Sequence, residues 1–99
     1  MKECREFRVF GRVQGVGFRR FIQAKVDSMN QPIELISGHI CNLEDGSVRV
    51  VAQSEVQMLD KLEQLLKIGT IRSVVERVES TLLENDENLS GFEILRQEK

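Results

Sequence analysis

A glycine-rich segment near the N-terminus has the composition of an anion-binding loop. It reads Gly11-Arg12-Val13-Gln14-Gly15-Val16-Gly17, and three glycines in seven positions are too many for a regular helix or strand. Glycines allow consecutive backbone N–H groups to turn toward one point, and the start of a following helix adds further unpaired N–H groups. Arg19 follows two residues later and carries a planar fork of donors. The segment therefore predicts a site for a phosphate or carboxylate group, with a turn that only permits close strand–helix packing as the alternative.

Two well-known phosphate-binding patterns do not describe this loop. No Gly-Lys-Ser/Thr follows the glycines, so it is not a Walker loop. A Rossmann fingerprint needs a parallel strand–helix–strand unit, which the elements below do not predict. Arg20 adjoins Arg19, but a helix turns about 100 degrees per residue, so the two side chains must point differently. We expect Arg20 on the surface.

For the other residues that could take part in catalysis, a structural role is the better interpretation when each residue is considered by itself. Asn42 precedes a turn and fits an ordinary strand-end amide. His39 is a single histidine in a strand, where packing or exposure is commoner than catalysis. Glu44 and Asp45 are adjacent carboxylates that suit turn formation better than acid–base work. Cys4 and Cys41 are not spaced with His39 as metal ligands, so no metal site is predicted.

Periodicity and turn residues divide the chain into seven elements. Apolar residues from Phe18 onward recur at three- and four-residue intervals and predict a helix of about ten residues, and Ser54-Glu55-Val56-Gln57 predicts a capping box before a second helix that ends at Gly69. Asp45-Gly46 predicts a tight hairpin turn. Strands are expected over residues 3–10, 33–42, 47–53, 71–83 and 91–95.

This order of elements predicts a ferredoxin-like βαββαβ sandwich of the α+β class. We expect an antiparallel sheet in the order 4-1-3-2, two helices on one face and a short terminal strand. Strand three then separates Cys4 from Cys41 by about 10 Å, beyond the roughly 7 Å limit for a disulfide. Both cysteines are therefore predicted to be free thiols.

Length, charge and composition narrow the protein's class. A chain of 99 residues suits one domain, so residues 1–99 are expected to form a single domain. The net charge is −2, but residues 1–25 hold seven basic and two acidic residues, a local excess that favours attraction of a small anion. No apolar run approaches the roughly 20 residues of a membrane span and no signal peptide is evident, so we expect a cytoplasmic protein that does not contact membranes.

Two blocks of this sequence resemble the signatures of the acylphosphatase family. The run from Gly11 to Arg19 is similar to the pattern G-x-V-Q-G-V-x-F-R, and the run from Gly38 to Val48 is similar to G-x-x-x-N-x-x-D-G-x-V. Gly91-Phe92-Glu93-Ile94 also resembles the closing strand of that family. The resemblance covers essentially the whole chain, and the ferredoxin-like order of elements is that family's fold.

The resemblance implies an enzyme that hydrolyses small acyl phosphates to a carboxylate and inorganic phosphate, without metal or cofactor. It implies that the backbone of Gln14, Gly15, Val16, Gly17 and Phe18 binds the phosphoryl group together with the Arg19 side chain. It also implies that the amide of Asn42 holds the attacking water, so Arg19 and Asn42 are the catalytic candidates. Phosphate or sulfate should bind as a product-like ligand, and we expect a monomer.

The sequence departs from the family pattern in three places. Residues 28–36 are several residues longer than the compact connection expected there, His39 and Cys41 replace aromatic, basic or polar residues, and Gly69-Thr70 stands where Gly-Pro is usual. None of these changes removes a proposed catalytic group. An alternative function is a non-catalytic anion-binding or regulatory module on the same fold. A nucleic-acid binder is disfavoured because Trp and Tyr are absent and the net charge is acidic.

Overall fold

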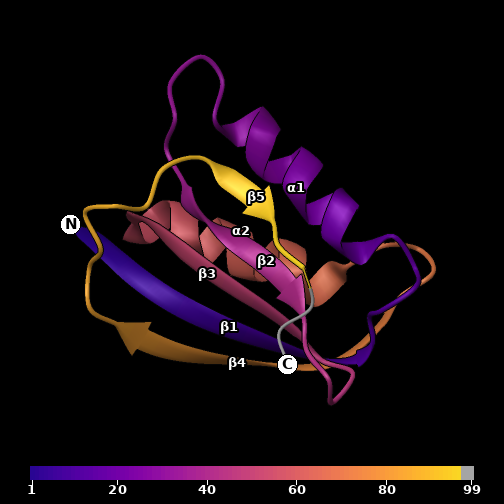
Figure 1. Ribbon diagram of the computed structural model, residues 1–99. Coiled ribbons are helices and arrows are strands. Elements are labelled where there is room, and N and C mark those ends of the chain that lie inside the picture. The colour runs from indigo at the N-terminus through magenta and orange to yellow at the C-terminus, as the bar shows by residue number, and fades with distance from the viewer. Residues whose placement is uncertain (97–99) are drawn as a thin grey trace.

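A computed structural model of the protein describes residues 1–96 and contains two helices and five strands in those residues. The elements in chain order are β1 (Lys2–Arg12), α1 (Phe18–Met29), β2 (Ser37–Asn42), β3 (Val48–Glu55), α2 (Val56–Ile68), β4 (Val74–Leu83) and β5 (Phe92–Ile94). The strands form one sheet in the order β4-β1-β3-β2-β5 (Figure 1). The predicted order 4-1-3-2 is therefore confirmed, with β5 added at the β2 edge.

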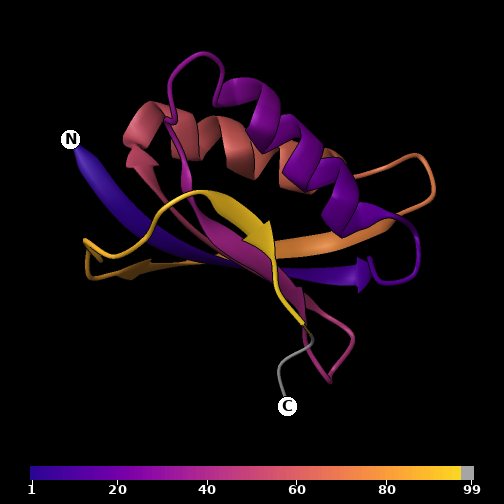
Figure 2. The ribbon, with the colours of Figure 1, turned by 45° about the horizontal axis from the view of Figure 1, so that its top comes forward.

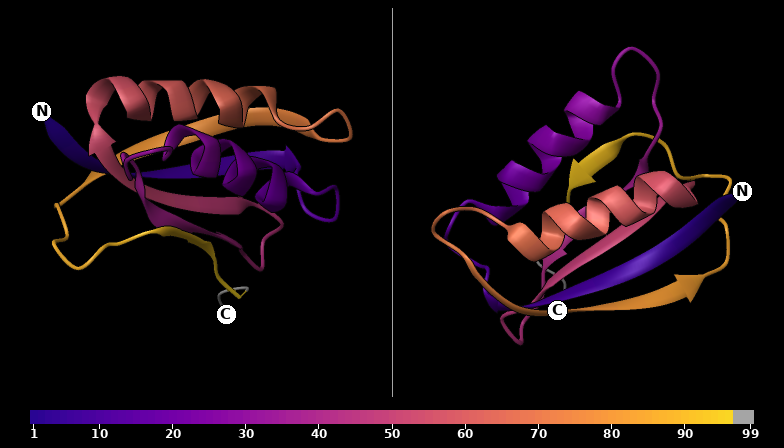
Figure 3. Two further views of the ribbon diagram at one scale, coloured as in Figure 1. Left: turned by 90° about the horizontal axis from the view of Figure 1, so that it is seen from above. Right: turned by 180° about the vertical axis from the view of Figure 1, so that it is seen from behind.

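Both helices cover the same face of the sheet, as the views from two further directions show (Figures 2 and 3). Side chains alternate along each strand, so every second residue points toward the helices. Phe7, Val9, Ile40, Val48 and Val50 are fully buried on this face. They pack against apolar residues of the helices, namely Phe18, Ile22 and Val26 of α1 and Leu59, Leu62 and Leu66 of α2.

The prediction of a purely antiparallel sheet is wrong, because β5 runs parallel to β2. β4 ends beside the start of β1, where Leu83 pairs with Cys4, and β2 starts at the same end of the sheet, where Ser37 pairs with Gln53 of β3. Residues 84–91 cross this end and lead directly into β5, whose Phe92 pairs with Gly38 near the start of β2. The two strands therefore begin together and run in the same direction.

The predicted capping box at Ser54 is wrong. Ser54 is buried within β3, and its Oγ donates a hydrogen bond of 2.5 Å to the carbonyl oxygen of Leu35 instead of capping α2. Glu55 is the N-cap residue of α2 and makes no side-chain cap hydrogen bond. Burial of the serine hydroxyl against a neighbouring loop has thus replaced the local contact that its spacing suggested.

Strand boundaries differ from the predicted ones at the sheet ends. β1 continues through Gly11 to Arg12 with a register shift at Phe10, so the predicted loop starts only at Val13. β2 begins at Ser37 rather than residue 33, and β4 begins at Val74 rather than residue 71. Cys4 and Cys41 form no disulfide and lie on strands separated by β3, as predicted. Within the described part of the chain, neither helix is long and apolar enough to cross a membrane.

Candidate active site

The loop between β1 and α1 owes its shape to glycine. Gly15 and Gly17 have φ angles of 73° and 76°, in the left-handed region that other residues rarely adopt. A Cβ atom on either glycine would meet nothing within 4 Å. Close packing of strand on helix therefore does not require these two glycines. Glycine is required at both positions because of their positive φ angles.

Backbone donors in this loop are available to a ligand. Within residues 1–96, no backbone N–H group of residues 14–17 donates a hydrogen bond. Gly17 is the N-cap residue of α1, and its carbonyl oxygen accepts the N–H of Phe21 at 3.0 Å, which opens the helix. The N–H groups of the first helical turn have no acceptor inside the helix. Loop and helix start thus provide adjacent donors and the positive end of the helix dipole.

Contacts on both sides hold the loop in place. Val13, Val16 and Phe18 are buried in the core. The Gln14 side chain crosses to the β2–β3 hairpin, where its Nε2 donates to the carbonyl oxygens of Leu43 at 2.8 Å and Ser47 at 2.9 Å. On the other side, Thr70 Oγ1 donates to the Val16 carbonyl oxygen at 3.3 Å. The loop is therefore anchored at its interior residues, while its glycines stay exposed.

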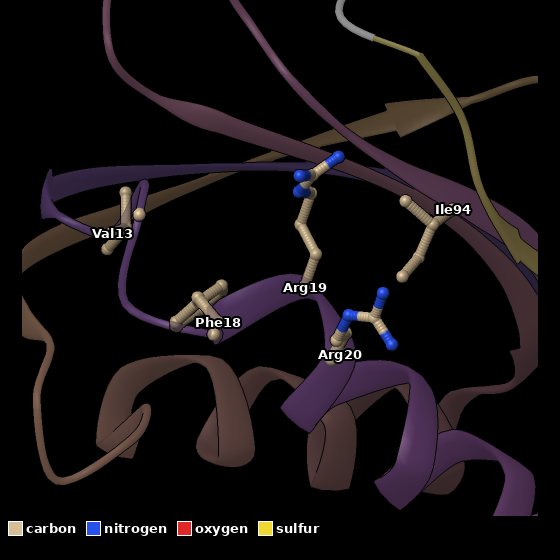
Figure 4. A pocket seen from close by; sticks show the side chains of 7 residues that line it. Val13, Phe18, Arg19, Arg20 and Ile94 are labelled. Atoms are coloured by element: carbon tan, nitrogen blue, oxygen red, sulfur yellow. The ribbon is translucent and has the colours of Figure 1, made fainter.

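A pocket of about 270 Å³ opens at the start of α1 (Figure 4). Two of its lining side chains are arginines, and none is a carboxylate. The lining residues are Val13, Gly15, Gly17, Phe18, Arg19, Arg20 and Ile94. Of the six residues predicted to bind phosphate, Gly15, Gly17, Phe18 and Arg19 are thus brought together, whereas Gln14 and Val16 lie in the same loop but do not line the pocket.

The two arginines point in different directions from the first turn of α1 (Figure 4). Arg19 is half-buried, whereas Arg20 is exposed, as predicted, and its guanidinium lies toward Ile94 of β5. Neither side chain forms a hydrogen bond or an ion pair with another residue in the described part of the chain. Two positive charges therefore face the pocket, and no carboxylate within residues 1–96 pairs with either of them.

Asn42 ends β2 on the face of the sheet that the helices cover. It pairs with Val48, a core residue of that face, and lies two residues beyond Ile40. Its Oδ1 atom is buried and accepts no hydrogen bond among residues 1–96. A buried amide oxygen without a partner costs stability, so it is expected where a ligand or water supplies the missing donor. Asn42 does not itself line the pocket.

The hairpin after Asn42 is stabilised by the predicted turn acid. Asp45 Oδ1 accepts hydrogen bonds from the Ser47 hydroxyl at 2.5 Å and the Ser47 N–H at 2.9 Å, and Oδ2 accepts one from Arg8 Nη2 at 2.9 Å. The two Ser47 contacts, with help from the Arg8 charge, lower the pKa of Asp45. Both carboxylate oxygens of Asp45 thus accept hydrogen bonds that stabilise the turn.

His39 and Cys41 alternate with Ile40 and Asn42 along β2, so they lie on the opposite face of the sheet from the pocket. Cys4 is buried, and burial raises the pKa of its thiol with a smaller contribution from Asp86. Neither histidine nor cysteine chemistry is therefore available at the pocket. Among the described residues, no three His, Cys, Asp or Glu side chains form a group that could hold a metal ion.

The longer connection after α1 lies at the far end of the sheet from the hairpin that follows Asn42 (Figure 1). The Asn30 side chain organises it: Oδ1 accepts the N–H groups of Leu35 and Ile36 at 2.8 Å each, and Nδ2 donates to the Ile36 carbonyl at 2.9 Å. The extra residues therefore do not obstruct the approach to Asn42.

Sequence reasoning missed Arg20, Val13 and Ile94 as pocket residues. Arg20 was expected on the surface and is exposed. It nevertheless lines the pocket, because the mouth of the pocket is part of the protein surface. Ile94 is 75 residues away from Arg19 in the chain and reaches the pocket only because β5 runs parallel to β2. The one available signal was the resemblance of residues 91–94 to a family block.

Comparisons with known proteins identify relatives of this chain. The acylphosphatase family model matches residues 5–94. An acylphosphatase from Helicobacter hepaticus (strain ATCC 51449 / 3B1) is 54% identical over 96 residues, covering 97% of this chain and 100% of that protein. One from Caldanaerobacter subterraneus subsp. tengcongensis is 35% identical over 94 residues, covering 95% and 99%. The crystal structure of acylphosphatase from Bacillus subtilis matches with a TM-score of 0.84 at 30% identity, covering 96% of this chain and 99% of that one.

Proposed function

This chain belongs to the acylphosphatase family and hydrolyses acyl phosphates to a carboxylate and inorganic phosphate, and we propose that Arg19, the backbone of residues 14–18 and Asn42 perform the reaction. The observation that carries the proposal is the pocket in which Arg19 lies with the glycines of an open loop and no carboxylate. A phosphoryl group needs several donors and positive charge, and this pocket offers both.

The reaction needs no covalent intermediate. A site that positions the substrate and the attacking water and stabilises the negative charge of the phosphoryl group is sufficient. The water oxygen bonds to phosphorus, the bond between phosphorus and the acyl oxygen breaks, and the carboxylate leaves with the electron pair. A carboxylate is a good leaving group, so a loose transition state needs little acid catalysis. The Arg19 guanidinium and the loop N–H groups stabilise the negative charge on the equatorial phosphoryl oxygens.

Asn42 is proposed to orient the attacking water. Its Oδ1 is a buried acceptor without a donor among the described residues, so a water that donates one hydrogen to Oδ1 is held with its lone pair free for attack. An amide has no basic site near neutral pH, so Asn42 does not remove the proton. We propose that a phosphate oxygen of the substrate accepts it.

Gln14 connects the two halves of this proposed site. Its side chain joins the phosphate loop to Leu43 and Ser47, which flank the hairpin directly after Asn42. The distance between the bound phosphorus and the held water therefore depends on the Gln14 contacts.

Release of phosphate from benzoyl phosphate by the parent, Arg19→Ala and Asn42→Ala proteins tests these roles. Both substitutions should lower kcat/KM by roughly 10²- to 10³-fold, as removal of one transition-state donor does in other enzymes. Arg19→Ala should also abolish competitive inhibition by inorganic phosphate, whereas Asn42→Ala should retain it. Turnover that survives Arg19→Ala nearly unchanged would show that the phosphoryl group binds elsewhere.

We also propose that the protein is a cytoplasmic monomer. The two cysteines of the protein form no disulfide, as is usual in a reducing compartment. Light scattering at assay concentration, with and without substrate, tests the monomer.

A further inference from the structure

Arg20 is a charged residue of the pocket that has no role in the mechanism proposed for a simple acyl phosphate. The proposed phosphoryl site consists of the loop N–H groups and Arg19, and it assigns no contact to Arg20. The pocket continues past Arg19 to Arg20 and Ile94 (Figure 4). Its volume of about 270 Å³ is close to the lower limit of small-molecule sites, so it can accommodate an acyl group as well as a phosphoryl group.

The Arg20 guanidinium is available to this second part of the substrate. It is exposed, and it forms no hydrogen bond or ion pair within residues 1–96. It lies beside Ile94, an apolar residue that can contact the carbon skeleton of an acyl group. No pocket-lining carboxylate competes for the guanidinium.

We propose that Arg20 selects acyl phosphates whose acyl group carries a second anionic group, a carboxylate or a phosphate. In this arrangement Arg19 holds the phosphoryl group, Ile94 contacts the acyl chain, and the Arg20 fork binds the distal anion. The inference rests on the proposed phosphoryl site at Arg19. Arg20 acts in substrate choice and not in bond cleavage, because it binds a part of the substrate remote from phosphorus.

A matched pair of substrates isolates the distal charge: 4-carboxybenzoyl phosphate and 4-methylbenzoyl phosphate. The two share the ring and the acyl phosphate, and the carboxylate cannot reach its own carbonyl to form a cyclic anhydride. The parent enzyme should show a kcat/KM about three- to tenfold higher for the carboxylate substrate, which is the size expected for one solvent-exposed charge-assisted contact. The ratio of the two kcat/KM values does not depend on how much of a variant is folded.

Arg20→Gln should reduce this ratio toward one, mainly by raising KM for the carboxylate substrate. Arg12→Gln is the control, because Arg12 is an exposed arginine at the end of β1 that does not line the pocket, and it should keep the parent ratio. A parent ratio at or below one, a ratio unchanged in Arg20→Gln, or an equal fall in Arg12→Gln would overturn the assignment.

Failure of the phosphoryl site has a different signature. If Arg19→Ala leaves hydrolysis of both substrates unchanged, the site proposed for catalysis is wrong. If Arg19→Ala lowers both rates equally while Arg20→Gln leaves their ratio unchanged, only the role of Arg20 is wrong.

Discussion

Polar side chains at the two ends of the sheet serve opposite purposes. At the far end, which comprises residues 30–36 and 84–91 and the start of β2, they bond within the protein: Asn30 makes three hydrogen bonds to its own loop, and Gln53 exchanges two with the backbone of Asp86. The site end comprises residues 13–20, Asn42 with the hairpin 43–47, and Ile94. There, neither Arg19 nor the Oδ1 of Asn42 has a partner among the described residues.

We interpret this difference as a separation of residues that stabilise the fold from residues that the proposed reaction uses. A satisfied hydrogen bond adds about 0.5–1.5 kcal/mol to stability, whereas a buried group without a partner costs about 1–3 kcal/mol. The far end needs its bonds because an irregular loop would otherwise leave buried backbone groups unpaired. At the site end, Arg19 and the Oδ1 of Asn42 have no partner among the described residues, and under the proposed function the substrate and the attacking water supply those partners. Substitutions at the two ends should therefore change different measured quantities.

The largest expected effect is the loss of activity in Arg19→Gln. We expect kcat/KM for benzoyl phosphate to fall by roughly 10²- to 10³-fold, while the melting temperature changes by no more than about 2–4 °C, because Arg19 bonds to no other described residue. Arg12→Gln removes the same charge from the end of β1 and should retain activity. A melting temperature lowered by 10 °C or so would instead assign Arg19 to the fold.

Asn30→Ala should show the reverse behaviour at the far end. The substitution leaves the backbone N–H groups of Leu35 and Ile36 without their acceptor and should destabilise the protein by about 2 kcal/mol, or roughly 10 °C in melting temperature. The activity of the folded enzyme well below the melting temperature should be that of the parent. Asn88→Ala is the matched control, since the Asn88 side chain bonds to no described residue. A fall in kcat at low temperature would mean that the far end does reach the site.

Gln14 lies at the site end, but its side chain bonds within the protein. It therefore tests how strictly structural and functional residues are separated between the two ends of the sheet. Gln14→Met keeps the length of the side chain and removes the donor to Leu43 and Ser47. We expect a destabilisation of about 1–2 kcal/mol and a several-fold lower kcat with little change in KM, because phosphate binding survives while Asn42 is less well positioned. Gln57→Met on the exposed face of α2 is the control. An increase in KM alone would contradict the positioning role.

The sequence predicted the features of this protein that rest on local chemistry. The helix periodicity, the Asp-Gly turn and the glycine loop before Arg19 each depend on residues close together in the chain, and each is present in the structure. The order of β1, β3 and β2 followed from the number and type of elements. The absence of a disulfide between Cys4 and Cys41 followed from that order.

What the sequence could not predict depends on contacts between distant residues. The parallel pairing of β5 follows from the path of residues 84–91 across the sheet end, which carries no periodic signal. Ser54 has the spacing of a helix cap, but its hydroxyl donates a hydrogen bond to the carbonyl oxygen of Leu35, nineteen residues earlier in the chain. Ile94 and Arg20 become neighbours in one pocket through the same tertiary arrangement. The role proposed for Asn42, to hold a water, was suggested only by family resemblance, because an amide before a turn is an ordinary feature.

The smallest expected effect concerns Asp45, which belongs to the site end and yet is fully bonded to Ser47 and Arg8. Its pKa is lower in the folded protein than its ordinary value of 3.8, first because of the Ser47 contacts. The carboxylate therefore contributes stability above the unfolded pKa, and this contribution disappears as the pH falls through the lower folded pKa. Melting temperatures of the parent should exceed those of Asp45→Asn slightly from pH 5 to 7, and the two should converge below pH 4. Glu44→Gln, whose side chain bonds to no described residue, should show no such convergence. A constant difference across the whole pH range would mean that the hairpin is stabilised by the shape of Asp45 and not by its charge.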